Sequence, residues 1–136
     1  MDEQKVQEKE HWMRLAIEEA KKAHDLEEVP IGAIVVLDNE IIGRGYNLRE
    51  TTQDATTHAE MIAIREACQT LKKTTLAGCD LYASTEPCPM CMSAIYLTRM
   101  RAVYFSTPSN ANQDYVYNQL SLKHDDRDIQ MTQLTP

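Results

Sequence analysis

Strand-like and helix-like segments alternate along the centre of this sequence, and this order limits the fold more than any other feature. Ile31–Leu37 is apolar and rich in β-branched residues, Asp38-Asn39 is a typical turn pair, and Ile41–Asn47 is a second apolar stretch. Together they predict a β-hairpin. Helix and strand patterns then follow one another in turn, which is typical of a partly parallel sheet with helices on its faces.

The spacing of apolar residues gives approximate bounds for the other elements. We expect helices at Val6–His24, His58–Leu71, Pro87–Arg99 and Tyr115–Leu122, strands at Asp80–Ser84, Ala102–Ser106 and Ile129–Leu134, and loops at Leu48–Thr57 and Thr107–Gln113. The acidic pair Glu27-Glu28 is expected to be a solvated turn. Neither an internal repeat nor a linker divides the chain, so residues 1–136 are expected to form a single α/β domain.

The acidic balance of the chain bears on its partners. The formal net charge is −7 and the sequence pI is near 5.0, whereas proteins that bind a phosphate backbone usually carry a basic surface. A large nucleic-acid partner is therefore disfavoured, although a local basic patch is compatible with an acidic total.

The N-terminal residues and the cysteines indicate the compartment. The first eleven residues are mostly polar or charged, unlike a signal peptide, and no apolar run reaches the roughly 18–20 residues that cross a bilayer. We therefore expect a cytoplasmic protein with no membrane partner. Disulfides are rare in that compartment, so Cys88 and Cys91 are better interpreted as a metal or redox site, while Cys68 and Cys79 are expected to be buried apolar groups.

The cysteine pair has the spacing and the setting of a metal site. Cys88 and Cys91 lie three residues apart at the start of a predicted helix, so their side chains share one face. Pro87 and Pro89 suit the entry and first turn of a helix, whose positive dipole end favours the thiolates that zinc requires. His58 also stands at a predicted helix start and is expected to be the third ligand.

No other residue offers a fourth ligand at a familiar spacing. Cys68 lies ten residues beyond His58 on the same predicted helix, which is about 15 Å along the axis, and Cys79 lies at the far end of its strand. Spacing alone leaves open three histidines in other segments, His11, His24 and His124. We therefore predict one catalytic zinc per chain, held by three protein ligands with a fourth position open for water.

Glu60 is the candidate general acid and base. Residues two apart, such as His58 and Glu60, do not face the same way within a helix. At a helix start the long Glu side chain can still turn toward the metal, because Cα–Cβ bonds tilt toward the N-terminus. Glu60 would then exchange protons with the metal-bound water.

Each of these segments alone is common, because C-x-x-C also occurs in redox pairs and structural zinc sites. The order H-x-E followed by P-C-x-x-C is the pattern of zinc-dependent deaminases. At these residues, and over roughly Glu10 to Ser106, the sequence resembles the cytidine-deaminase-like superfamily. The resemblance implies a hydrolytic nucleobase deaminase, a three-layer α/β/α sandwich around a five-stranded mixed sheet, and a homodimer.

Two branches of this superfamily are similar to different parts of the chain. The segments Glu28–Ala33 and Gly45–Arg49 resemble bacterial tRNA adenosine deaminases, whereas Glu86–Cys91, Ser93–Tyr96 and Asp114–Tyr117 resemble bacterial guanine deaminases. The tRNA enzymes carry a Gly- and Lys-containing loop and a basic C-terminal helix. Here Ser106–Gln113 contains no Lys, Arg or Gly, and the sequence ends at Pro136 without such a helix.

The resemblance implies that Asn47, Ala59 and Asp114 contact the substrate base, although Asn47 by itself is a typical residue for a turn at the end of a strand. We expect the substrate to be a free purine base, and guanine is the leading candidate. One alternative is a tRNA-specific deaminase that converts adenosine to inosine at the anticodon wobble position. The other is a non-catalytic zinc-binding relative, against which the presence of Glu60 argues.

Overall fold

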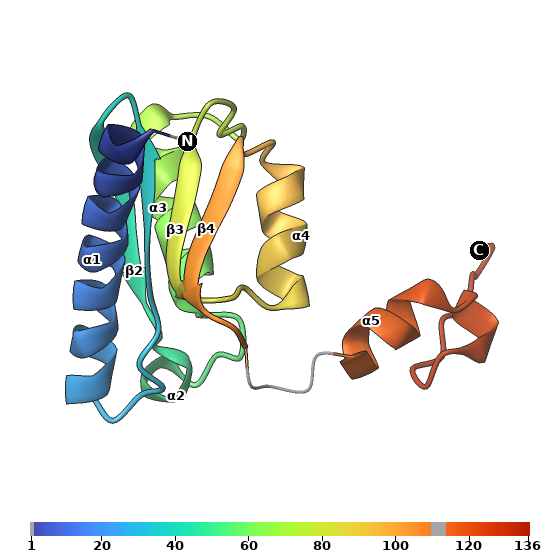
Figure 1. Cartoon of the computed structure of the whole chain (residues 1–136). Helices are drawn as coiled ribbons and strands as arrows, with labels where there is room; N and C mark the ends of the chain where they lie inside the picture. Colours follow the sequence, from blue (N-terminus) through green and yellow to red (C-terminus); the bar gives the residue numbers. More distant parts are fainter. Residues whose placement is uncertain (1, 110–113) are drawn as a thin grey trace.

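The protein is described by a computed structural model that covers residues 2–109 and 114–136 (Figure 1). Its sheet consists of β1 (Gly32–Leu37), β2 (Glu40–Tyr46), β3 (Asp80–Thr85) and β4 (Ala102–Thr107), in the order β2-β1-β3-β4. β1 runs antiparallel to β2 and β3, and β3 runs parallel to β4. The predicted hairpin and the partly parallel sheet are therefore confirmed.

Helices cover both faces of the sheet (Figure 1). Successive residues of a strand face opposite sides, and β1 shows this directly. Ile34 and Val36 pack with Ala16 of α1 (Glu3–Asp25). Ala33 and Val35 belong to the opposite cluster, which also holds residues of α3 (Ala59–Leu71) and α4 (Pro89–Leu97). The described body thus has the expected layers of helix, sheet and helix.

Glycines bring β2 unusually close to α3. A Cβ atom on Gly45 would lie 2.2 Å from the carbonyl oxygen of Ala59, and one on Gly43 would lie 2.2 Å from that of Ala63. Because both obstacles are backbone atoms, side-chain rearrangement cannot relieve either contact. The first turn of α3 therefore packs directly on the backbone of β2. This contact determines how far the residues around Ala59 lie from the sheet.

The prediction of five strands is wrong, since the described residues form a sheet of four. The segment expected to be the last strand, Ile129–Leu134, has no regular structure, and Ile129 and Leu134 are 79% and 80% exposed. A strand needs a neighbour to satisfy its backbone groups. This segment lies with α5 (Asp114–Ser121), away from the sheet (Figure 1). Its alternating apolar residues therefore have no neighbouring strand in the described sheet.

Several bounds also differ from the predictions. α1 begins three residues earlier than predicted, at Glu3, because Asp2 caps it by accepting a hydrogen bond from the Lys5 N–H at 2.9 Å. A short helix, α2 (Arg49–Thr52), interrupts the segment expected to be a loop. A 3₁₀ turn, η1 (His124–Asp126), follows α5. Within the described part of the chain, no helix combines the length and the apolar character that a membrane crossing requires.

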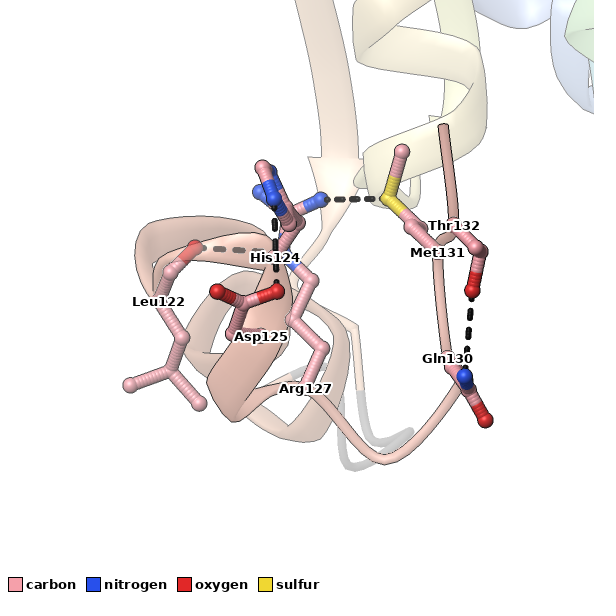
Figure 2. Close-up of polar contacts among 7 residues, drawn as sticks. All are labelled: Leu122, His124, Asp125, Arg127, Gln130, Met131 and Thr132. Atoms are coloured by element: carbon pink, nitrogen blue, oxygen red, sulfur yellow. Dashed lines mark hydrogen bonds and ion pairs between the residues drawn. The ribbon is translucent and has the colours of Figure 1, made fainter. Parts of the chain in front are cut away.

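The residues after α5 are held together largely by Arg127. Its guanidinium donates to the carbonyl oxygens of Leu122 at 3.1 Å and Leu120 at 3.0 Å, and it also contacts the Met131 sulfur at 3.5 Å. Figure 2 shows how Arg127 links Leu122, just after the helix, to Met131 in the irregular tail. This segment therefore has local structure of its own, although it projects from the body (Figure 1).

Candidate metal centre and substrate cavity

Two helix starts converge at one end of the sheet. His58 is the N-cap residue of α3 and Cys88 is the N-cap residue of α4, both with extended backbone. Cys91 lies three residues into the same turn as Cys88. The prediction that these three residues stand at helix starts is confirmed, and the structure brings all three together.

The distances between the three side chains suit a zinc ion. His58 Nδ1 lies 3.5 Å from Cys88 Sγ and 3.7 Å from Cys91 Sγ. With Zn–S near 2.3 Å and Zn–N near 2.1 Å, a tetrahedral zinc site separates its N and S ligands by about 3.6 Å. The three side chains could therefore hold zinc with little rearrangement.

The other candidate ligands lie elsewhere. Among the residues that the structure describes, only these three His, Cys, Asp or Glu side chains gather within 4.8 Å of one another. Cys68 and Cys79 pack in the apolar core, as expected. The remaining histidines neighbour other groups: His11 lies against Trp12, His24 against Asp25 and His124 against Asp125. A site with three protein ligands leaves one tetrahedral position for another species, as catalytic zinc sites do.

Mutual contacts shift the titration of the three groups. Hydrogen bonding to Cys91, together with a hydrogen bond to His58 and its charge, lowers the pKa of the Cys88 thiol to about 4. The same contact with Cys88 raises the pKa of Cys91, and hydrogen bonding to Cys88 raises the pKa of His58. Cys88 is therefore a thiolate at neutral pH, which is the form in which cysteine binds zinc.

Glu60 lies beside this cluster of His58, Cys88 and Cys91. It occupies the first turn of α3, is only 3% exposed and lines the cavity next to His58 and Cys88. Burial raises the pKa of its carboxyl group, while hydrogen bonding and the charge of His58 oppose that shift. A raised pKa makes a buried carboxylate a stronger proton acceptor than an ordinary Glu, which suits a general base that later returns the proton.

A cavity of about 200 Å³ opens above this cluster. Drug-sized ligands usually occupy roughly 300–1,000 Å³, so this cavity suits a single flat ring system better than a larger molecule. Its lining comes from five stretches of chain: Glu28, Val29 and Ile31; Asn47, Arg49 and Glu50; His58, Ala59 and Glu60; Thr85, Glu86 and Cys88; and Ser109.

Asn47 and Ala59 both line the cavity, and their expected contact with a substrate base stays a prediction. Asn47 is 6% exposed, and its side chain donates to the Val29 carbonyl at 3.3 Å and accepts from the Arg49 N–H at 3.2 Å. The second of these is the turn contact expected of an Asn at a strand end. An amide has two N–H donors and two acceptor lone pairs, so one donor and one lone pair remain for a ligand.

Asp114 is not among the cavity-lining residues. It is the exposed first residue of α5, which projects from the body (Figure 1). The expected loop Thr107–Gln113 falls partly on residues 110–113, outside the described residues. Thr107 to Ser109 are described, and the Ser109 N–H donates to Glu86 at 3.2 Å.

The sequence prediction missed one wall of the cavity. Glu28, expected to be solvated, is only 5% exposed and lines the cavity. Its position beside Val29 and Pro30, within the segment that resembles tRNA adenosine deaminases, was the available indication. Arg49 and Glu86 also line the cavity, and nothing in their spacing distinguished them from ordinary surface charges.

Comparison with known proteins agrees with this geometry. Residues 6–107 match the model of the cytidine and deoxycytidylate deaminase zinc-binding region. The chain is 52% identical to the tRNA-specific adenosine deaminase of Bacillus subtilis over 96 residues, which is 71% of this chain and 60% of that protein. The chain spans between 60% and 65% of the length of three bacterial tRNA-specific adenosine deaminases that it matches.

Two solved structures resemble the fold. The X-ray structure of guanine deaminase from Bacillus subtilis superposes with a TM-score of 0.86 at 33% identity, covering 100% of this chain and 87% of that one. A structure from a study of A-to-I editing by tRNA:A34 deaminases superposes with a TM-score of 0.71 at 44% identity, covering 73% of this chain and 72% of that one.

Proposed function

The chain belongs to the family of cytidine and deoxycytidylate deaminase zinc-binding domains, and we propose that it is a zinc-dependent hydrolytic deaminase whose substrate is a free purine base, with guanine first. His58, Cys88 and Cys91 would hold one zinc per chain, and a bound zinc lowers the pKa of water to about 7. In the overall reaction, water replaces the amino group on the ring, which gives a ring carbonyl and ammonia.

In this proposal the chain's own residues bind the base and move the protons. Glu60 accepts a proton as water adds to the carbon that bears the amine and delivers it to the adjacent ring nitrogen; it then takes the second proton from the added hydroxyl group and gives it to the departing amine, which leaves as ammonia. The remaining donor and acceptor of Asn47 hold the edge of the base, and Ala59, with no bulky side chain, lets the ring lie against the first turn of α3.

The single observation that carries the choice of substrate is the extent of the structural match. The guanine deaminase superposes on the whole chain, including the segment after β4, whereas the tRNA:A34 deaminase structure covers 73% of it. The sequence of Ser106–Gln113 also contains no Lys or Arg, and binding to a phosphate backbone depends on such positive charges.

A second candidate is the wobble adenosine of tRNA, and two observations favour it. The 52% identical relative is a tRNA-specific adenosine deaminase. Arg49 lies at the cavity, is exposed, and forms no ion pair with any described residue. A guanidinium in that position is suited to a phosphate next to a flipped-out base.

A substrate panel separates the two candidates. We expect ammonia release from guanine and little inosine in an anticodon stem-loop, with weak stem-loop binding that depends little on salt. Asp114→Ala is expected to reduce guanine turnover with zinc retained, because a carboxylate accepts from the N–H groups that guanine presents. Asp128→Ala is the control, since Asp128 instead accepts from Tyr115 at 2.7 Å. Inosine formation without guanine turnover would assign the chain to the tRNA branch.

We also propose that the protein is a homodimer. One side of α5 and the following tail present an apolar groove, lined by Tyr115, Val116, Leu120, Ile129 and Met131, all exposed. On the body, Tyr96, Leu97 and Phe105 are 73%, 79% and 46% exposed. A second copy would cover such surfaces, and it would set whether Asp114 approaches the cavity of its own chain or that of the partner.

Light scattering tests the dimer. We expect a solution mass of about 31 kDa, twice the 15.5 kDa of the chain. Leu120→Glu places a charge in the apolar groove and is expected to shift the mass to that of one chain. Asn118→Glu adds the same charge to a residue of α5 that does not line the groove, and is the control. A wild-type protein of single-chain mass would contradict the proposal.

A further inference from the structure

Glu28 is a buried carboxylate that the proposed chemistry does not use. It follows the end of α1, where the N–H groups of Leu26 and Glu28 both donate to the Ala23 carbonyl at 3.0 Å, and Glu27 adopts a left-handed φ of 62°. This reversal turns the chain back toward the sheet. The Glu28 side chain, 5% exposed, therefore points inward at the cavity rather than into solvent.

The partners of Glu28 are the first backbone groups of α2. Its Oε1 accepts from the Glu50 N–H at 3.0 Å, and its Oε2 accepts from the Thr51 N–H at 2.6 Å. The residue at the N-cap of α2 is Leu48, which has no side-chain acceptor. The first N–H groups of a helix need acceptors from elsewhere, and here a residue more than twenty positions earlier supplies both.

This contact joins two of the stretches that line the cavity. Asn47 adds two further links, since its backbone N–H donates to Ile31 at 3.0 Å and its side chain donates to Val29 at 3.3 Å. Among these links only Glu28 is charged, and charge-assisted hydrogen bonds are roughly twice as strong as neutral ones. Of these links to the wall that carries Asn47 and Arg49, the Glu28 carboxylate thus makes the strongest.

We propose that Glu28 is a positioning residue for substrate binding: its carboxylate caps α2 and so holds Asn47 and Arg49 at the cavity that His58 and Cys88 also line. It does not touch the reacting atoms. Its effect is on the affinity for the substrate rather than on the chemical step. This inference rests on the proposed deaminase activity, but not on which of the two substrates is correct.

The test replaces one carboxylate oxygen. In Glu28→Gln, an N–H₂ group must face one of the two backbone N–H donors, so one hydrogen bond is lost. We expect KM to rise about tenfold, the scale of losing one hydrogen bond to a charged group, with kcat and zinc content nearly unchanged. A rise in KM at constant kcat marks a loss of ground-state binding. Glu28→Asp keeps the charge and is expected to restore part of the affinity.

Glu19→Gln is the matched control. Glu19 is also buried, at 3% exposure, but its carboxylate pairs with Lys22 at 3.0 Å and Arg44 at 3.5 Å and does not line the cavity. Its replacement is expected to lower the melting temperature without changing KM. If Glu19→Gln raised KM as much as Glu28→Gln, or if Glu28→Gln left KM unchanged, the inference would be overturned.

Amide hydrogen exchange gives a readout that needs no substrate. The amides of Glu50 and Thr51 are expected to exchange faster in Glu28→Gln than in the wild type, and at the wild-type rate in Glu19→Gln. Unchanged exchange in Glu28→Gln would refute the cap. Wild-type protein that turns over neither guanine nor the stem-loop would refute the proposed function instead, and the exchange result would still decide on the cap.

Discussion

Glu60→Gln is expected to reduce turnover by about 10²–10⁴-fold, the usual contribution of general acid–base catalysis, or by more if one carboxylate serves every proton transfer. The amide keeps the size and polarity of the side chain but cannot accept the proton. Because Glu60 is not one of the three clustered ligands, zinc content and the melting temperature should stay close to those of the wild type.

Glu66→Gln is the control for this experiment, since Glu66 lies on the same helix and is exposed. The measurements are single-turnover rates, zinc by atomic absorption, and thermal unfolding. Wild-type turnover in Glu60→Gln would mean that another group moves the protons. Loss of zinc together with turnover would instead make Glu60 part of the metal centre.

Cys88→Ser is expected to abolish turnover together with zinc binding. A hydroxyl group with a high pKa replaces the thiol whose pKa lies near 4, and zinc requires the deprotonated ligand. The wild type should contain about one zinc per chain, lose activity with a chelator, and recover it when zinc is restored. Its melting temperature should fall after chelation, because a metal that binds only the folded state stabilises that state.

Cys68→Ala serves as the control for the cysteine substitution, because Cys68 packs with the core and takes no part in the cluster. It should retain zinc and activity, with at most a modest loss of stability. Zinc retained at the wild-type level in Cys88→Ser would exclude Cys88 as a ligand, and a metal spectrum that indicates four protein ligands would contradict the open site.

The parts of the fold that sequence could predict are those governed by local patterns. The hairpin around Asp38-Asn39 depends on residues next to one another, and so does the start of α3 after His58. The three clustered ligands were also predictable, because motif spacing and helix starts place them without knowledge of the remaining structure. The partly parallel sheet with helices on its faces followed from the alternation of helix and strand patterns.

The unpredicted features depend on contacts between distant parts of the chain. Ile129–Leu134 has a strand-like pattern, but whether it pairs depends on a neighbour that local sequence does not specify. Glu28 looks like one of two surface charges, and only the approach of α2 makes it buried. The role expected of Asp114 remains a prediction for the same reason, since it depends on where α5 lies relative to a cavity.

The two sides of the cavity are fixed in different ways, and this has an evolutionary consequence. On the metal side, Gly43 and Gly45 seat α3 on the sheet by backbone contact, so any side chain added there displaces the reactive groups. The wall that carries Asn47 and Arg49 is instead held largely by side-chain hydrogen bonds that a few substitutions can rearrange. A lineage with this architecture can exchange one substrate for another through the second wall while its chemistry stays constant. Divergence of substrates within one reaction type is therefore an expected outcome of how the molecule is built.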